Sequence, residues 1–240
     1  MKIATWNVAY ARGETSNERR RAVLKRIDAD VWVLTETHID LTPGSGYRPI
    51  HSCERNAPGN RSVVADSRWV TIWARDELMP RPIHVTDPER TAACSLETES
   101  GPFWVFGTVL PWYGDREKGS VAVEVARQQR DWLRMKDEVG PVGCVAGDFN
   151  VNLGGGPHYY GSRESKSAVK ASLCETGLFV LTDYPNAKLP GRDYGLIDHI
   201  AVSQELSVPR PAPCVWDKTD EDDHLLSDHA GVAVDIAVDL

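Results

Sequence analysis

The sequence predicts an α/β fold, because two apolar strand patterns flank a helical pattern at the start of the chain and further strand and helix patterns follow. Residues 2–7 and 31–34 are apolar runs typical of buried strands. Between them, Thr15-x-x-Glu18 is a capping box that predicts the start of a helix, which ends at residues 28–30. A strand, a helix and a strand in this order favour parallel strands whose carboxyl ends meet at one edge of a sheet.

The rest of the chain alternates short β runs with two longer helical patterns. Pro, Gly, Asn and Asp separate the short runs between residues 47 and 109, which predicts a meander. Helices are predicted over 119–139 and near 164–174, and the glycine-rich stretch 153–162 between them must be a loop. The predicted strands of this part lie near 62–65, 70–74, 92–97, 104–109, 142–146, 196–202 and 231–238.

The composition is that of a globular protein with one core. Because 41% of its 240 residues are hydrophobic, we expect a single domain over residues 1–240. No apolar run is long enough to span a bilayer, and the first residues enter a strand with no room for a secretion signal. The five cysteines are scattered and form no C-x-x-C pair, which indicates reduced thiols. If the chain is full-length, we therefore expect a cytoplasmic protein.

The net charge of −8 disfavours tight non-specific binding to duplex DNA, which depends on Lys and Arg side chains that neutralise phosphates. Bound Mg²⁺ would offset part of this charge. Single-stranded or structured nucleic acid stays a candidate partner, and no protein partner is evident from the sequence.

The strongest functional signal is a set of five short polar motifs at strand ends. Four of them follow a buried apolar run and the last precedes one, so folding could gather all five at one edge of a sheet. Their carboxylate and amide oxygens suit Mg²⁺, Mn²⁺ or Ca²⁺, whereas Zn²⁺ would draw more His and Cys. Such a site beside a histidine indicates phosphoester chemistry. The motifs are Thr5-Trp6-Asn7, Thr35-Glu36-Thr37, Gly147-Asp148-Phe149-Asn150, Ile197-Asp198-His199 and Ser227-Asp228-His229.

These motifs, in this order and over nearly the whole chain, resemble those of the endonuclease/exonuclease/phosphatase superfamily. The resemblance implies a four-layer α/β sandwich, in which two mixed β-sheets pack face to face with helices outside. It also implies a hydrolase of phosphoester bonds, and it does not select one substrate.

The resemblance further implies a site for one or two Mg²⁺ or Mn²⁺ ions. Glu36 is the expected principal ligand, Asn7 the expected source of a neutral oxygen, and Asp228 the remaining carboxylate on the metal side. This chain has Thr35 where the family has Gln, which leaves the ligand itself intact. Asn7 or Glu36 alone would also fit a turn or a helix cap.

The expected catalytic residues come from the last three motifs. By the resemblance, Asp148 activates the attacking water, while Asn150 contacts phosphate and holds Asp148 in place. His229 stabilises the charge that develops on phosphorus, and Asp198 orients it and keeps it charged. We expect His199, the neighbour of Asp198, to be structural.

The strand before the central helix departs from the family pattern. Nucleases of the superfamily place a phosphate-contacting Tyr or His there, whereas this chain has Thr108 and Val109. Thr108 or Tyr113 could take that role, and Trp112 and Tyr159 could belong to a platform on which bases stack. Metal-assisted hydrolysis survives this departure, and a specific deoxyribonuclease assignment does not.

The sequence therefore predicts a metal-dependent phosphodiester hydrolase of the nuclease type. The alternative is a phosphatase or phosphodiesterase of small or lipid-derived phosphoesters, which the acidic charge favours. A third hypothesis is a binding module that kept the fold and lost turnover.

Overall fold

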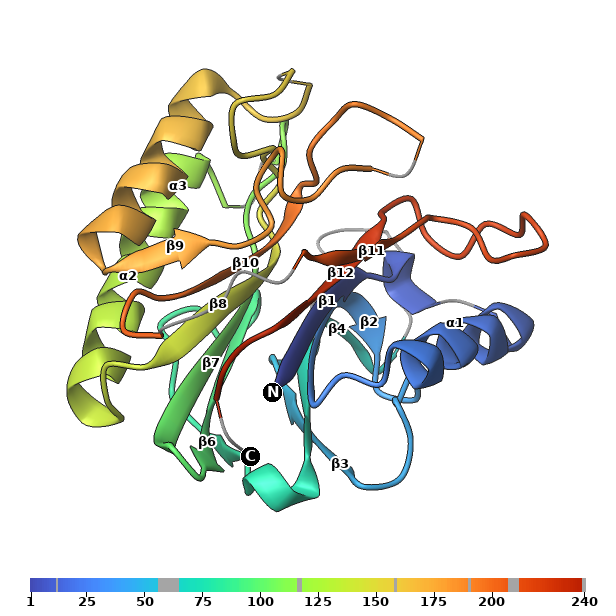
Figure 1. Ribbon diagram of the computed structural model, residues 1–240, viewed down its shortest axis with the longest axis horizontal. Coiled ribbons are helices and arrows are strands. Elements are labelled where there is room, and N and C mark those ends of the chain that lie inside the picture. Colours follow the sequence, from blue (N-terminus) through green and yellow to red (C-terminus); the bar gives the residue numbers. More distant parts are fainter. Residues whose placement is uncertain are drawn as a thin grey trace.

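Two six-stranded sheets pack face to face in the computed structural model (Figure 1). It describes residues 1–11, 13–55, 65–115, 118–157, 159–189, 191–206 and 212–238. The first sheet contains β1 (Lys2–Asn7), β2 (Val31–His38), β3 (Tyr47–His51), β4 (Ser67–Arg75), β11 (Cys214–Trp216) and β12 (Gly231–Asp235). The second contains β5 (Arg81–Pro82), β6 (Thr91–Thr98), β7 (Gly101–Val109), β8 (Gly143–Asp148), β9 (Leu178–Val180) and β10 (Asp198–Ser203).

Both sheets are mixed. The strand order is β11-β12-β1-β2-β4-β3 in the first sheet and β5-β6-β7-β8-β10-β9 in the second. In each sheet one central pair is parallel, namely β1 with β2 and β7 with β8, and the neighbouring pairs are antiparallel. The last strand of the chain, β12, therefore lies directly beside the first, β1.

Helices cover the two outer faces of the sandwich. Figure 1 shows α1 (Glu14–Ile27) outside the first sheet, and α2 (Val121–Glu138) with α3 (Arg163–Glu175) outside the second. Short 3-10 turns, η1 (Ala9–Ala11) and η2 (Asp76–Leu78), follow β1 and β4. The four-layer α/β sandwich predicted from the sequence is confirmed.

Three apolar cores separate these four layers. The central core joins the inner faces of the sheets, the second packs β7 and β8 against α2 and α3, and the third packs β1 and β2 against α1. The side chains alternate between cores as the strand period requires, so Val31 and Val33 face the central core while Trp32 and Leu34 face α1. Large aromatic residues such as Trp104 and Trp132 fill the space beneath α2.

The first helix begins earlier than the capping box predicts. It starts at Glu14, its N-cap is Gly13, and no side chain caps it, so Thr15 lies inside the first turn. The helix ends at Ile27, and Asp28 adopts a left-handed conformation as the C-cap. The other two predicted helices are confirmed, and each is capped by a serine, Ser120 and Ser162, whose side chain accepts a backbone N–H.

Most predicted strands are present, with bounds that differ by a few residues. The structure adds four strands that the sequence analysis did not locate individually, β3, β5, β9 and β11, all of which lie at sheet edges, and β5 has only two residues. The run predicted at 62–65 falls mostly outside the described residues. Within the described part of the chain, no helix combines the length and apolar character that a membrane crossing demands.

The two sheets pack closely at a glycine within β7. A Cβ atom on Gly107 would lie 2.6 Å from a methyl group of Val70 and 3.0 Å from one of Val33, both on the opposite sheet. We expect Gly107→Ala to destabilise the protein by about 1–3 kcal/mol, because well-packed cores resist an added methyl group. Urea unfolding measures the change.

The matched control is Gly155→Ala, since Gly155 is exposed and has no atom within 4 Å of its added Cβ. Equal unfolding free energies for the two variants would contradict a tight contact between the sheets at Gly107.

Candidate active site

Strand pairing brings the predicted carboxylates to one end of the sandwich. Asn7 is the last residue of β1 and pairs with Thr35, which directly precedes Glu36 in β2. In the second sheet, Asp148 ends β8 and lies directly opposite Asp198, the first residue of β10. The register alone therefore places two carboxylates from sequence-distant motifs side by side.

Asp148 is buried at the centre of the site, with 1% of its surface exposed. Its Oδ1 accepts the backbone N–H of Asn150 at 2.9 Å, and its Oδ2 accepts the side-chain amides of Asn150 and Asn7, each at 3.1 Å. The Asn150 amide also donates to the carbonyl of Leu110 at 2.9 Å. Both sheets therefore hold this carboxyl group.

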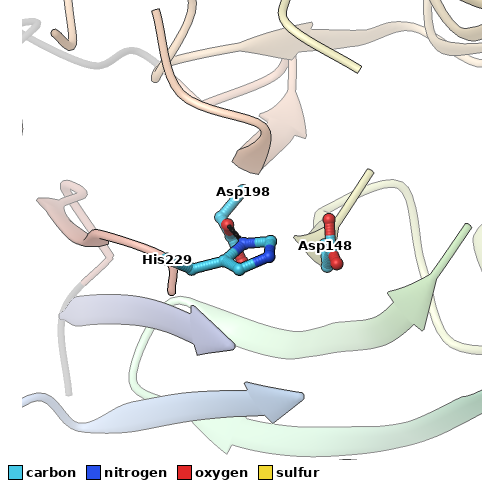
Figure 2. A group of neighbouring side chains, drawn as sticks. All are labelled: Asp148, Asp198 and His229. Carbon is cyan, nitrogen blue, oxygen red and sulfur yellow. Dashed lines mark hydrogen bonds and ion pairs between the residues drawn. The ribbon is translucent and has the colours of Figure 1, made fainter. Parts of the chain in front are cut away.

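His229 faces Asp148 and is oriented by Asp198. Its Nδ1 lies 2.6 Å from Oδ2 of Asp198, and Figure 2 shows the imidazole ring directed toward Asp148 with Asp198 against it. Ligand atoms of these three side chains lie within 4.8 Å of one another. The second oxygen of Asp198, Oδ1, is buried and has no hydrogen-bond partner in the described part of the chain.

Ser227 fixes the backbone that carries His229. Its hydroxyl donates to the carbonyl of Asn7 at 2.6 Å and accepts the backbone N–H of His229 at 3.0 Å. The indole N–H of Trp6 donates to the carbonyl of His229 at 3.1 Å. The motif at the C-terminal strand is thus tied to the motif at the end of β1.

Glu36 lies on the other side of Asn7. The Asn7 amide nitrogen donates to Glu36 Oε1 at 3.1 Å, and its oxygen accepts the backbone N–H of Ala9 at 3.0 Å. Asn7 therefore joins Glu36 to Asp148 through one amide group. The backbone is left-handed at Glu36, with φ 47°, and at Asn150, with φ 50°, a conformation that costs roughly 1–2 kcal/mol per residue. Such strain is concentrated at functional sites.

The site carries unusual protonation equilibria. Burial, together with the charges of Asp198 and Glu36, raises the pKa of Asp148 to about 7 against the opposing effect of His229. Burial opposes charge on His229, but the neighbouring carboxylates Asp198 and Asp148 outweigh it and raise the pKa of the imidazole to about 10. His229 is therefore an imidazolium at neutral pH.

Of the remaining predicted residues, some lie at the site and others do not. Asp228 is exposed and lines a pocket of about 240 Å³ together with Asp198, His229 and Tyr159. Thr108 is not brought to the site, because its hydroxyl is buried and donates to Gln128 Oε1 on α2 at 3.0 Å.

Trp112 and Tyr113 lie beyond Asn150 rather than beside His229. Both line a smaller pocket of about 190 Å³ that Asn150 also lines. Trp112 is half-buried, whereas 93% of Tyr113 is exposed. They border the site from the side of the second sheet.

His199 is structural, as expected. It is fully buried, its Nε2 lies 3.0 Å from the carbonyl of Val151, and its Nδ1 lies 3.2 Å from the hydroxyl of Thr182. Burial lowers its pKa to about 4, so the ring stays neutral in the folded protein.

Comparison with known proteins shows to which family the chain belongs. The sequence profile of the endonuclease/exonuclease/phosphatase family matches residues 4–229, which include all of these polar motifs. The chain belongs to the endonuclease/exonuclease/phosphatase family. No curated protein matches it in sequence.

Solved structures of this family share the fold at low sequence identity. The catalytic domain of Xenopus laevis APE2 has a TM-score of 0.71 and 15% identity, over 100% of this chain and 92% of that one. The 3′ phosphatase NExo from Neisseria, bound to a product DNA hairpin, has a TM-score of 0.70 and 18% identity, over 98% and 99%. The human nocturnin catalytic domain with a bound sulfate anion has a TM-score of 0.69 and 13% identity, over 99% and 94%.

Two residues of this family member's site were missed by sequence reasoning. Ser227 belongs to the motif Ser227-Asp228-His229, so its place beside His229 in the sequence could have indicated its role. Tyr10 had no signal, because it reaches Glu36 only through a left-handed turn in which Ala9, Tyr10 and Ala11 have φ 48°, 67° and 48°. Burial, the charge of Glu36 and a hydrogen bond to Glu36 together raise the pKa of Tyr10 to about 12.

The neutral state of His199 predicts a pH-dependent stability. Its folded pKa of about 4 lies below the ordinary value of 6.5, so the unfolded chain binds a proton in this interval that the folded protein does not. The contribution of neutral His199 to the free energy of unfolding is fully present above pH 6.5. It decreases as the pH drops toward 4, by roughly 2 kcal/mol at pH 5. His199→Gln lacks this effect, so its destabilisation relative to wild type should shrink from pH 7 to pH 5.

Urea unfolding at several pH values measures this trend. The control is His84→Gln, which changes an exposed histidine and should show no such trend. A difference between wild type and His199→Gln that stays constant with pH would refute a neutral buried imidazole.

Proposed function

We propose that the chain, acting as one domain over residues 1–240, is a metal-dependent phosphodiester hydrolase of the nuclease type. The observation that carries this proposal is the buried Asp148, which has an imidazolium on one side and the Asn7–Glu36 pair on the other. Hydrolysis of a phosphoester needs a group that accepts the proton of water and a cation that stabilises the developing charge. Both groups converge here.

Each residue has a defined part in this mechanism. Asp148 accepts a proton from the attacking water, and the two N–H donors of Asn150 keep its carboxylate in one orientation. His229, held by Asp198, donates a hydrogen bond to an oxygen on phosphorus as negative charge develops there. Attack occurs in line with the departing oxygen, and no covalent intermediate forms.

The donor set fits a hard divalent cation. Three carboxyl groups, from Glu36, Asp148 and Asp198, share the site with a single imidazolium. Burial raises the pKa of Asp148, and the negative charges of Asp198 and Glu36 act in the same direction. We propose that Glu36 is the principal ligand of Mg²⁺ or Mn²⁺, with Asn7 positioning it and Asp228 as a further carboxylate. A bound ion supplies Lewis-acid stabilisation of the phosphoryl oxygens.

A small or lipid-derived phosphoester is the second candidate substrate. The net charge of −8 opposes duplex binding, and the pocket of about 240 Å³ beside His229 suits a small leaving group. Tyr159 and Tyr160 line this pocket, and burial raises the pKa of both, so they stay neutral hydrogen-bonding and stacking groups. Single-stranded nucleic acid fits the same features and remains the first candidate.

The cellular setting follows from the thiols. All five cysteines are free, and two of them are buried. This supports our proposal that the enzyme acts in a reducing compartment, the cytoplasm.

Removal of either central group should abolish readily measured turnover. We expect Asp148→Asn and His229→Gln each to lower kcat by about 10²–10³-fold, because each removes a preorganised group that acts in the transition state. The assay measures cleavage of single- and double-stranded DNA, RNA, bis-p-nitrophenyl phosphate and p-nitrophenyl phosphate in Mg²⁺. Folding of each variant is checked by circular dichroism.

The matched control is Asp137→Asn, which removes an exposed carboxylate in the last turn of α2, an element that contributes none of the site motifs. Turnover that survives His229→Gln on every substrate of the panel would sink the proposed mechanism. Cleavage of the small esters alone would select the second candidate.

The proposed metal site predicts a separate signature. EDTA should abolish cleavage, and Glu36→Gln should raise the Mg²⁺ concentration for half-maximal rate by about tenfold or more, because a neutral amide replaces the charged ligand. A titration of rate against Mg²⁺ measures the shift. An unchanged titration curve would remove Glu36 from the ligand set.

A further inference from the structure

A ladder of alternating aromatic and guanidinium groups lies beside Glu36. The Arg55 guanidinium carbon is 4.4 Å from the ring centroid of Tyr10 and 3.8 Å from that of Trp69. Arg90 is packed in the same way. Its guanidinium carbon lies 4.6 Å from the ring centroid of Trp69 and 4.8 Å from that of Trp112. These five side chains come from η1, the segment after β3, β4, the segment before β6 and the loop after β7.

The two arginines of this ladder differ in what occupies their N–H groups. Arg90 is buried, with 1% of its surface exposed, and it forms an ion pair with the equally buried Asp115. Arg55 is half-buried, and no carboxylate among the described residues forms an ion pair with it. The rings of Tyr10 and Trp69 pack against its guanidinium, and the Tyr10 hydroxyl takes part in one hydrogen bond with it, so the remaining N–H donors are the part left for a ligand.

The aromatic neighbour of Arg55 ties it to the active site. The hydroxyl of Tyr10 hydrogen-bonds to Glu36, and the charge of Arg55 acts on the same hydroxyl. Tyr10 reaches this place through the left-handed turn of residues 9–11, a strained backbone that the surrounding structure must maintain. Arg55 is therefore fixed one side chain away from the proposed metal ligand.

Arg55 lies on the Glu36 side of the site, because Tyr10 hydrogen-bonds to Glu36. Glu36 is joined to Asp148 through Asn7, whereas His229 faces Asp148 directly. A phosphorus atom attacked by water at Asp148 and contacted by His229 belongs to the His229 side. An anion at Arg55 is then a different group of the same substrate.

We propose that Arg55 binds a second, uncleaved phosphate group of the substrate. The substrate then carries at least two phosphates, as an oligonucleotide or a small bisphosphorylated molecule does. A guanidinium fork matches two phosphate oxygens in one plane, and its stacked position removes most of the rotational freedom that binding would otherwise have to restrict. This inference rests on the proposed phosphoesterase function and narrows its substrate class.

Equilibrium binding tests the proposal without turnover. Isothermal titration in EDTA compares thymidine 3′,5′-bisphosphate with thymidine 5′-monophosphate on the wild type, Arg55→Gln and Arg55→Lys. We expect the wild type to bind the bisphosphate about tenfold or more tightly than the monophosphate, because a charge-assisted, bidentate hydrogen bond is added. Arg55→Gln should lose this preference, and Arg55→Lys, which keeps the charge and loses the fork, should retain only part of it.

The matched control is Arg81→Gln, which removes the same charge from an exposed position on β5. It should keep the wild-type preference. No preference in the wild type, or the same preference in Arg55→Gln and Arg81→Gln, would overturn the proposal. Thermal unfolding of each variant confirms that binding is compared between folded proteins.

Hydrolysis separates this proposal from the proposed function. Bis-p-nitrophenyl phosphate reports on hydrolysis alone, because Arg81→Gln should cleave it at the wild-type rate while His229→Gln does not. If no His229-dependent cleavage occurs, the proposed phosphoesterase function is wrong. The ratio of bisphosphate to monophosphate affinity still decides whether Arg55 binds a second phosphate. The titrations are repeated with tetrathymidylate and with inositol 1,4-bisphosphate. The compound whose affinity falls more from wild type to Arg55→Gln identifies the source of the second phosphate.

Discussion

Burial of the Asp148 carboxyl group is the constraint on which the rest of the site depends. A carboxyl group with 1% exposure has no water to satisfy its oxygens, so the protein must supply hydrogen-bond donors of its own. One donor comes from β1 on the opposite sheet and two come from the turn that follows β8. The two sheets must therefore meet at this point with their strand ends aligned.

The same burial explains the charge pattern around Asp148. Its carboxyl group, those of Asp198 and Glu36, and one imidazole share a small space from which water is largely excluded. Attraction to the carboxylates keeps the imidazole charged, and repulsion between the carboxylates themselves makes a cation favourable there. Charge in the site is thus coupled, so a change at one of these residues alters the protonation of the others.

The sequence was sufficient for the sandwich and for most of the central residues. Clean buried strands end at Asn7 and Asp148, and local patterns of this kind survive in the folded protein because tertiary packing reinforces them. Edge strands such as β9 and β11 have only three residues, and their pairing depends on the neighbouring strand more than on their own pattern. The capping box at Thr15 was wrong because the helix begins at Glu14 with Gly13 as its N-cap, so Thr15 already lies inside the first turn.

Contacts between distant segments were beyond the reach of the sequence. Arg55 meets Tyr10 and Trp69 only after three segments have folded together, and an arginine in a loop carries no local mark of such stacking. Thr108 illustrates the opposite error. Its position in β7 suggested a substrate contact, but the pleat turns its hydroxyl toward Gln128 and α2.

The pairing of β12 with β1 has a consequence for the order of synthesis. The segment that carries Asn7 leaves the ribosome well before the segment that carries His229, which Ser227 anchors to it. During translation the nascent chain therefore holds Asp148 and Glu36 before the imidazole exists. The fold delays assembly of the complete charge constellation until the segment that carries β12 has been synthesised and has paired with β1.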